Sequence, residues 1–211
     1  MEVREYQAVD GKTPVTRWLS GLRDPAARAR IVARLDRLKA GLLGDWKSVG
    51  EGVCELRIDY GPGYRVYYAQ DGEALILLLC GGDKRSQAKD VEQLMRTGKI
   101  TRPVRPSRPF RAADHLQSEA EVAAYIEAML EDGDARAVPG ALRTVAEAVG
   151  GMAVLARKTG LSRETLYRTL SKRGNPRLDT LAAILGAFGL RLTVRARSGR
   201  GTRGRAATAR A

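Results

Sequence analysis

Apolar positions in the first hundred residues change their spacing several times, and each change marks the end of an element. Spacings of three and four residues predict two helices, which open at Thr13-Pro14 and Asp24-Pro25, a capping side chain followed by proline. Short alternating or continuous apolar runs predict strands, and the run at 75–80 is apolar enough to be covered on both faces. The predicted order is a strand at 3–9, the two helices, strands at 52–60, 64–70 and 75–80, and a closing helix at 84–97.

The Gly-Pro-Gly segment at 61–63 predicts a hairpin with a three-residue loop. In this register Asp59 lies opposite Arg65, and Arg57 lies opposite Tyr67. Side chains alternate between the faces of a strand, so a one-residue slip would carry charge into the core. The preferred register gives a core face with Leu56, Ile58, Val66 and Tyr68, and a polar face with Glu55, Arg57, Asp59, Arg65 and Tyr67.

The polar face has the residue types that bind a phosphodiester. Arg57 and Arg65 are suited to hold phosphate oxygens and to stabilise a pentacovalent transition state, with Lys84 in the nearby Gly-Gly-Asp-Lys turn. Tyrosines on the hairpin are candidates for stacking on bases. The simpler interpretation is a solvated sheet face with a surface pair between Arg65 and Asp59.

The second half of the chain is dominated by helical spacing. Ser118 and Glu121 form a capping box that opens a helix. Asp134 is a candidate cap for the next helix, which Pro139-Gly140 should break or kink. The remaining pattern predicts helices at 141–149, 152–159, 162–172 and 178–188, and a short strand at 191–195.

The helices at 152–159 and 162–172 have the features of a helix-turn-helix. Ala156 is small enough for a close approach of the two helices, and Gly160 suits a left-handed turn between them. The second helix is the expected recognition helix, with candidate DNA contacts at Ser162, Arg163, Thr165, Tyr167, Arg168 and Lys172. The alternative is an ordinary helical hairpin with solvated basic faces.

The composition is globular, with 44% apolar and 29% charged residues in a chain of 211, and the net charge of +13 favours a nucleic-acid partner. A single histidine, His115, excludes multi-histidine metal sites, and we expect it at the surface or in a cap, with no metal or cofactor in the protein. No apolar run approaches the ~20 residues that span a bilayer. We therefore expect a cytoplasmic protein without a membrane partner, in which Cys54 and Cys80 are reduced core residues.

Charge and proline divide the chain into two unlike domains. Prolines and arginines alternate between Pro103 and Pro109, which predicts an extended basic linker at 98–111. The tail at 198–211 has four arginines and no acid, and we expect it to be disordered. The predicted boundaries are 1–97, 98–111, 112–197 and 198–211.

Two segments of the first domain, GEGVCELRIDYGPGYRVY at 50–67 and LLCGGDK at 78–84, resemble the addiction-module killer proteins. These are small toxins of the HigB type in the RelE/ParE superfamily. The resemblance implies an α+β fold with a small antiparallel sheet and packed helices, and a ribosome-dependent mRNA endoribonuclease. It also implies that Arg57 and Arg65 bind the phosphate and the transition state, that Lys84 is an acid–base or electrostatic group, and that Tyr67 or Tyr68 stacks on a base.

The second domain resembles the addiction-module antidote proteins, the HigA-like antitoxins with an all-α helix-turn-helix of the XRE type. The matching segments are DHLQSEAEVAAYIEAMLEDGD at 114–134, GLSRETLY at 160–167 and GNP at 174–176. Pro139-Gly140 departs from this family's pattern. The resemblance implies neutralisation of the toxin domain, within one chain or between chains.

Together the two resemblances predict a toxin fused to its own antitoxin, which binds operator DNA and, as helix-turn-helix proteins usually do, forms a homodimer. The competing prediction is a DNA-binding repressor in which the toxin-like domain is an inactive scaffold or dimerisation module. A third origin is a frameshift that joins two genes, which the genomic reading frame would reveal.

Overall fold

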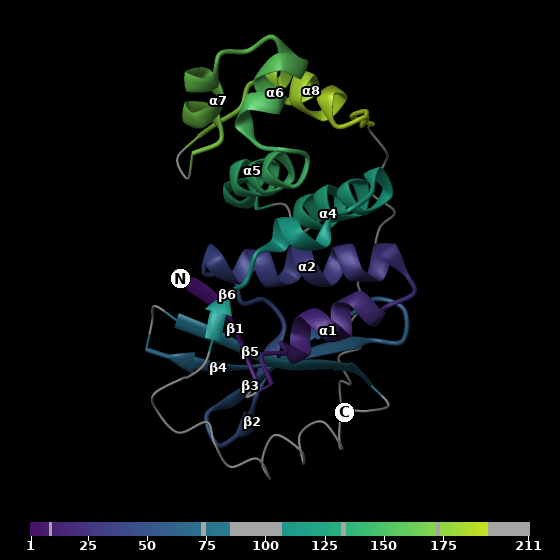
Figure 1. Cartoon of the computed structure of the whole chain (residues 1–211), viewed down its shortest axis with the longest axis vertical. Helices are drawn as coiled ribbons and strands as arrows, with labels where there is room; N and C mark the ends of the chain where they lie inside the picture. The colour runs from purple at the N-terminus through teal and green to yellow at the C-terminus, as the bar shows by residue number, and fades with distance from the viewer. Residues whose placement is uncertain (9, 73–74, 85–106, 132–133, 172–173, 194–211) are drawn as a thin grey trace, which may run out of the picture.

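A computed structural model describes residues 1–8, 10–72, 75–84, 107–131, 134–171 and 174–193. The α+β class is confirmed, with a sheet and two helices in the N-terminal part and helices in the C-terminal part. Figure 1 shows these elements in layers, with the sheet at one end, α2 and α4 in the middle, and α6, α7 and α8 at the other end. Of the predicted closing helix at 84–97, the structure describes only Lys84, which lies in a turn, and the rest is outside the described residues.

The sheet is mixed, whereas the resemblance to the killer proteins implied an antiparallel one. Its six strands follow the order β2-β3-β4-β5-β1-β6, and β1 runs parallel to β5 while the other neighbours are antiparallel. Both helices and three strands lie between β1 and β5 in the chain, and such a crossover connection allows parallel pairing. The strands are β1 (Glu2–Tyr6), β2 (Trp46–Gly50), β3 (Val53–Ile58), β4 (Tyr64–Asp71), β5 (Leu75–Asp83) and β6 (Ser107–Pro109).

The β3–β4 hairpin is shifted by two residues from the predicted register. Ile58 lies opposite Tyr64, and Arg57 lies opposite Arg65. Asp59 falls in the loop, so the predicted pairing of Asp59 with Arg65 is wrong. The backbone N–H of Gly63 donates to the carbonyl of Tyr60 at 3.0 Å, which closes the turn inside a longer loop than predicted. A shift by two residues preserves the faces, so the predicted core face is confirmed.

Two edge strands, β2 and β6, were not predicted from the sequence. Most of β2 is exposed, so it has no alternation of buried and exposed positions to detect. Strand β6 lies in the segment predicted as a linker and pairs with β1. It contains Pro109, which an outermost strand tolerates because it pairs on only one side.

The N-terminal helices are α1 (Pro14–Gly21) and α2 (Pro25–Lys39). The Asp24 side chain caps α2 by accepting a hydrogen bond from the N–H of Ala26 at 2.9 Å, as predicted. Thr13 makes no such cap and instead accepts a hydrogen bond from Arg108 at 3.2 Å. Helix α2 is buried at 31–33 and again at 35–38, so it is covered around most of its circumference.

The C-terminal part is helical and matches most of the predicted spans. Pro139 lies in the first turn of α5 and so starts this helix instead of breaking it. Residues 191–193 are not a strand, and 194–195 lie outside the described residues. The elements are the 3₁₀ helices η1 (Ala112–His115) and η2 (Ala135–Ala137), and the helices α4 (Glu119–Glu131), α5 (Val138–Ala148), α6 (Met152–Thr159), α7 (Arg163–Thr169) and α8 (Leu178–Ala187).

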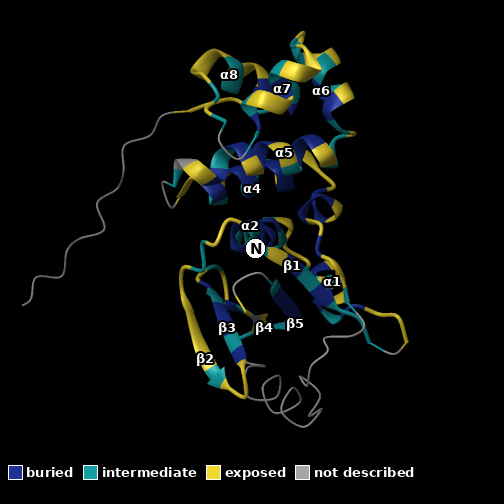
Figure 2. Cartoon of the chain, turned by 90° about the vertical axis from the view of Figure 1, so that its left-hand side faces the viewer, coloured by how far each residue is buried: buried dark blue, intermediate teal, exposed yellow. Residues whose placement is uncertain are grey.

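One apolar core runs through the described part of the molecule, from one face of the sheet through α2 and α4 to α8. Figure 2 shows the buried positions continuing across the boundary between α2 and α4. A second, smaller cluster lies on the other face of the sheet and contains Tyr67, Leu77 and Leu79. Strand β5 contributes to both clusters, which confirms that it is covered on both faces.

Candidate functional site

Arg57 and Arg65 lie directly opposite each other in β3 and β4, on the face that points away from α1 and α2. The Arg57 side chain is 39% exposed and its Nη2 lies 2.9 Å from Oδ1 of Asp45. The Arg65 side chain is only 13% exposed. Directly opposite side chains are about 5 Å apart at Cβ, so the two guanidinium groups can reach a single phosphate group.

Glu55 lies beside the two arginines and is fully buried. Its Oε1 is 3.4 Å from Nε of Arg65 and 3.9 Å from Nε of Arg57. Lys47 of β2 approaches the same oxygen at 3.8 Å. Glu55 was predicted on this face without a functional role, and Lys47 was not predicted at all. The signal was weak because Lys47 lies in β2, which has no detectable period.

Lys84 lies next to Arg65 and is exposed. Its backbone N–H donates to the carbonyl of Gly63 at 2.9 Å. A Cβ at Gly63 would lie 3.7 Å from Nη1 of Arg65 and 4.0 Å from Cβ of Lys84, so both side chains border this glycine. The end of β5 leading to Lys84 is held by Trp18, whose ring packs against the backbone of Gly81. The structure therefore brings Arg57, Arg65 and Lys84 together.

Tyr67 and Tyr68 are both fully buried. Tyr68 is on the core face, opposite to the arginines, and burial together with the neighbouring Cys54 raises its pKa above the usual range. Tyr67 shares the face of the arginines, and its hydroxyl donates to Oε2 of Glu55 at 3.4 Å. Stacking on a base needs an exposed ring face, which neither tyrosine has in this structure, so we do not retain this role.

The predicted helix-turn-helix geometry is present in α6 and α7. Gly160 has a φ of +70° and caps α6 in the left-handed conformation. Ser162 caps α7 by accepting a hydrogen bond from the N–H of Thr165 at 3.1 Å. Arg163 and Arg168 are exposed, and Tyr167 is 46% exposed. Lys172 lies outside the described residues.

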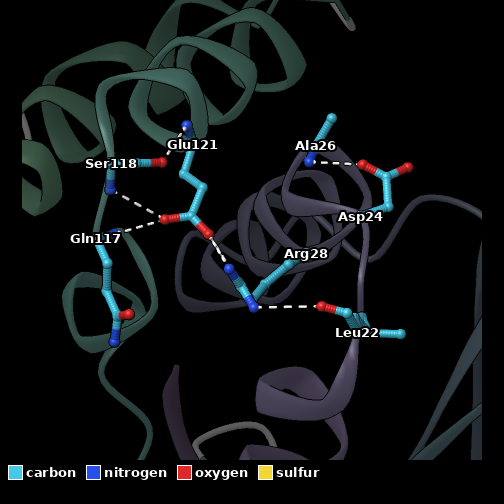
Figure 3. Close-up of polar contacts among 7 residues, drawn as sticks. All are labelled: Leu22, Asp24, Ala26, Arg28, Gln117, Ser118 and Glu121. Atoms are coloured by element: carbon cyan, nitrogen blue, oxygen red, sulfur yellow. Dashed lines mark hydrogen bonds and ion pairs between the residues drawn. The ribbon is translucent and has the colours of Figure 1, made fainter.

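The N- and C-terminal parts meet through a buried ion pair between α2 and α4, shown in Figure 3. Nε and Nη2 of Arg28 both donate to Oε1 of Glu121. The other carboxylate oxygen, Oε2, accepts from the backbone N–H of Gln117 at 2.8 Å and of Ser118 at 3.0 Å, completing the predicted capping box. Burial opposes ionisation of Glu121, but these hydrogen bonds outweigh it and lower the pKa.

A second polar contact crosses the same boundary. Asp36 of α2 is buried, and its Oδ2 accepts from the hydroxyl of Tyr125 at 2.6 Å and of Thr144 at 2.8 Å. Tyr125 is fully buried, and its pKa is raised well above the ordinary value by burial and by Asp36. Arg30 adds an ion pair to Glu131 at 2.7 Å on the rim. Basic α2 and acidic α4 are therefore complementary in charge.

The segment of β6 and η1 provides a third attachment. Arg108 donates to Oε1 of Glu5 at 2.8 Å, and Arg4 donates to the carbonyl of Ser107 at 2.7 Å. Phe110 is buried, and His115 stacks on it with ring centroids 5.4 Å apart. His115 was predicted at the surface or in a cap, and this is wrong, because η1 turns it toward the boundary with α2.

Other site types find little support in the described residues. No three His, Cys, Asp or Glu side chains among them gather as a metal-binding group. No single helix there is long and apolar enough to cross a membrane; α5 and α6 reach that length only together, and they are bent by 98°. Cys54 and Cys80 do not form a disulfide.

Comparisons with known proteins define a class for each part of the chain. Residues 17–99 match the family described as phage derived protein Gp49-like, and residues 107–196 match the family described as probable addiction module antidote protein. An uncharacterized protein of Haemophilus influenzae is 54% identical over 76 residues, which are 36% of this chain and 77% of the relative. A second uncharacterized protein of that organism is 36% identical over 85 residues, which are 40% of this chain and 87% of the relative.

No solved structure matches the chain closely. The chain belongs to the addiction-module families, with a toxin domain of the Gp49-like, HigB-related type followed by an antidote domain. It is a fused toxin–antidote pair, and its two domains contact each other through α2 and α4.

Proposed function

We propose that the N-terminal domain is an endoribonuclease that cleaves mRNA on the ribosome, and that the C-terminal domain restrains it and binds operator DNA. The observation that carries the first part is the cross-strand pair of Arg57 and Arg65 with Lys84 beside it. These groups lie on the sheet face opposite to the helices. None of the polar contacts that the two arginines make within the described residues involves the antidote domain.

The chemistry needs only groups that this face and the RNA supply. The 2′-hydroxyl of the RNA attacks the neighbouring phosphorus, and the bond to the 5′-oxygen of the next nucleotide breaks. Arg57 and Arg65 stabilise the charge that builds on the phosphoryl oxygens, which is the largest single contribution in many enzymes. Lys84 assists as an acid–base or electrostatic group. Ribosomes and operator DNA as partners imply a cytoplasmic location.

The contact between α2 and α4 supports the proposed restraint. The Arg28–Glu121 and Asp36–Tyr125 contacts fix how the antidote domain lies on α2, away from the arginine face. A covalent connection keeps the antidote at a local concentration of roughly millimolar, so dissociation is rare within one chain. The same surfaces also suit pairing between two chains, and the operator-binding form is a homodimer.

Expression of residues 1–97 tests the toxin activity. We expect the fragment to arrest bacterial growth and to cleave translated mRNA, whereas the full chain does neither. The matched control is Arg65→Ala in the fragment. Arg65 points away from the main core, and Lys47 and Arg57 remain beside the buried Glu55, so the fold should survive. Loss of one transition-state donor should lower the rate by about 10²–10³. An equally toxic full chain would contradict the restraint, and an equally toxic Arg65→Ala fragment would contradict the site.

Two observations favour a second candidate, a DNA-binding repressor with an inactive toxin-like scaffold. Tyr67 and Tyr68 are buried, so neither ring can stack on a base in this structure. The apolar core also continues from the sheet into the antidote helices, as expected for a scaffold. Absence of RNA cleavage by a folded 1–97 fragment would select this alternative.

A further inference from the structure

Glu55 is a charged side chain in a position where charge is costly. It is fully buried, and a buried carboxylate is stable only where cations or hydrogen bonds compensate its charge. Nitrogen atoms of Lys47, Arg57 and Arg65 lie 3.8, 3.9 and 3.4 Å from one of its oxygens, Oε1. The hydroxyl of Tyr67 contacts its other oxygen. Three cations from three strands thus converge on one buried oxygen.

The strand register explains this convergence. Lys47 and Tyr67 are the two cross-strand partners of Glu55, one on each side. Arg57 and Arg65 are the next pair on the same face, and like charges directly opposite each other repel. The Glu55 carboxylate, two residues before Arg57 on the same face, compensates this repulsion. It helps to set the direction of the Arg65 guanidinium group and, together with Asp45, that of Arg57.

The cations and the carboxylate differ in their access to solvent. Lys47 is 46% exposed and Arg57 is 39% exposed, whereas Glu55 is completely covered. A ligand from solvent therefore meets the cations and does not touch the carboxylate. The cations therefore form the surface of the site, and the buried Glu55 carboxylate lies beneath them.

We propose that Glu55 is a positioning residue that holds Arg57 and Arg65 as one site for a phosphodiester of single-stranded RNA, and that Lys47 is a further phosphate-binding residue of this site. The inference rests on the proposed RNA-cleaving function. Binding sites are most effective where a second layer of side chains fixes the ligand-binding groups. Glu55 supplies this layer, and Lys47 extends the cationic surface onto β2.

A positioning role and a purely structural role predict opposite changes for Glu55→Gln. Removal of a negative charge among three cations strengthens their attraction for a phosphate, so the Kd for RNA should fall. The Arg65 guanidinium group loses its fixed direction at the same time, so transition-state stabilisation should decrease. A purely structural role predicts weaker binding together with a loss of fold.

The experiment uses the full chain, so that the two domains remain in contact. The signals of the arginine Nε–Hε groups are followed by NMR, with Arg57→Lys and Arg65→Lys to assign them. The probe is a 2′-O-methyl trinucleotide, which carries phosphodiesters but lacks the attacking hydroxyl. We expect both arginine signals of the wild type to show restricted rotation and to shift with one common Kd.

In Glu55→Gln we expect the Arg65 signal to lose its restricted rotation, whereas Asp45 still holds Arg57. The Kd should be equal to or lower than that of the wild type. Glu164→Gln, which removes an exposed carboxylate on α7, is the matched control and should change neither the rotation of the arginine side chains nor the Kd. Unchanged rotation of Arg65 in Glu55→Gln, or a chain that no longer folds, would overturn the positioning role. A wild type whose arginine signals ignore the trinucleotide would instead contradict the proposed RNA site itself.

Lys47→Gln tests the second half of the proposal without disturbing the core. Loss of one phosphate contact to single-stranded RNA should lower the slope of log Kd against log salt by about 0.7. Rotation of both arginine side chains should remain restricted. Lys12→Gln removes the same charge from an exposed position elsewhere in the toxin domain and is the control. An unchanged slope in Lys47→Gln would overturn its assignment as a phosphate-binding residue.

Discussion

At the scale of single residues, Gly81 shows how closely the end of β5 is packed. A Cβ at this position would overlap the ring of Trp18, which in turn makes an edge contact with Tyr64 at 6.1 Å. Only glycine allows the indole to approach the backbone here. Trp18 thus links α1 to the segment that carries Lys84.

We expect Gly81→Ala to destabilise the protein by about 1–3 kcal/mol, because the added methyl group overpacks a tight contact. The measurement is the free energy of unfolding in denaturant. Gly186→Ala is the control, since nothing lies within 4 Å of its Cβ position in α8, and alanine should be neutral or stabilising there. Equal stability of Gly81→Ala and the wild type would contradict the packing of Trp18.

His115 makes the stability depend on pH. Burial disfavours its charged form and lowers its pKa below the ordinary 6.5, although Glu5 and Asp114 act in the opposite direction. The unfolded chain therefore takes up a proton near pH 6.5, where the folded chain still resists it. Stability contributed by neutral His115 is present above this pH and is lost as the pH falls below it.

We expect His115→Phe to reduce this loss while it keeps a ring stacked on Phe110. The measurement is the difference in unfolding free energy between pH 7.5 and 5.5 for the wild type and the variant. Comparison of the two differences cancels the contributions of other titrating groups. An equal loss in both proteins would contradict a buried neutral histidine.

At the scale of elements, helix α2 packs against the sheet on one side and against the antidote helices on the other. One side packs on the sheet, and Arg28, Arg30 and Asp36 connect the helix to α4 and α5. Buried polar pairs of this kind fix the relative position of two helices because a shifted register leaves charges unpaired. They therefore define how the antidote recognises the toxin.

We expect Tyr125→Phe to destabilise the chain by about 1.5–3 kcal/mol, since the hydroxyl donates to a charged, buried Asp36. Tyr167→Phe removes the same group from an exposed position on α7 and should have little effect. Thermal or chemical unfolding measures both. A similar stability of the two variants would show that the Asp36 contact contributes nothing across the boundary.

At the scale of the molecule, the shared core predicts that toxin and antidote domains unfold together. Both tryptophans, Trp18 and Trp46, lie in the toxin domain, whereas most of the helical residues that the structure describes belong to the antidote domain. Tryptophan fluorescence and far-ultraviolet circular dichroism should therefore give one coincident transition. Two separate transitions would contradict a continuous core.

From the helix-turn-helix of the antidote domain we expect sequence-specific binding to the promoter of the gene that encodes this protein. If Arg163 reads a guanine edge, Arg163→Ala should cost ~1–3 kcal/mol and relax the preference at one base position. Loss of a phosphate contact in Arg168→Ala should weaken all sequences alike and lower the salt slope by about one.

Binding to promoter and random DNA is compared by titration at several salt concentrations, with a chain ending at Arg197 so that the arginine-rich tail does not contribute. Arg143→Ala, an exposed arginine on α5, is the control. A chain without preference for its promoter would remove the repressor role and leave the antidote role.

Local patterns in the sequence were sufficient for several parts of this structure. The caps at Asp24, Ser118 and Ser162 and the left-handed Gly160 were predicted because each involves atoms only a few residues apart. The faces of β3 and β4 were also correct despite the wrong register, since a period of two survives a shift of two.

Only the tertiary structure determined the features that depend on distant parts of the chain. The parallel pairing of β1 with β5, the burial of Glu55 and His115, and the second covered side of α2 all arise from segments that meet after folding. Arg28 of α2 illustrates this, because it binds Glu121, which lies 93 residues further along the chain. The sequence by itself determined which side chains share a face, and the tertiary structure decided what each face contacts, because burial and charge pairing depend on neighbours that no local pattern contains.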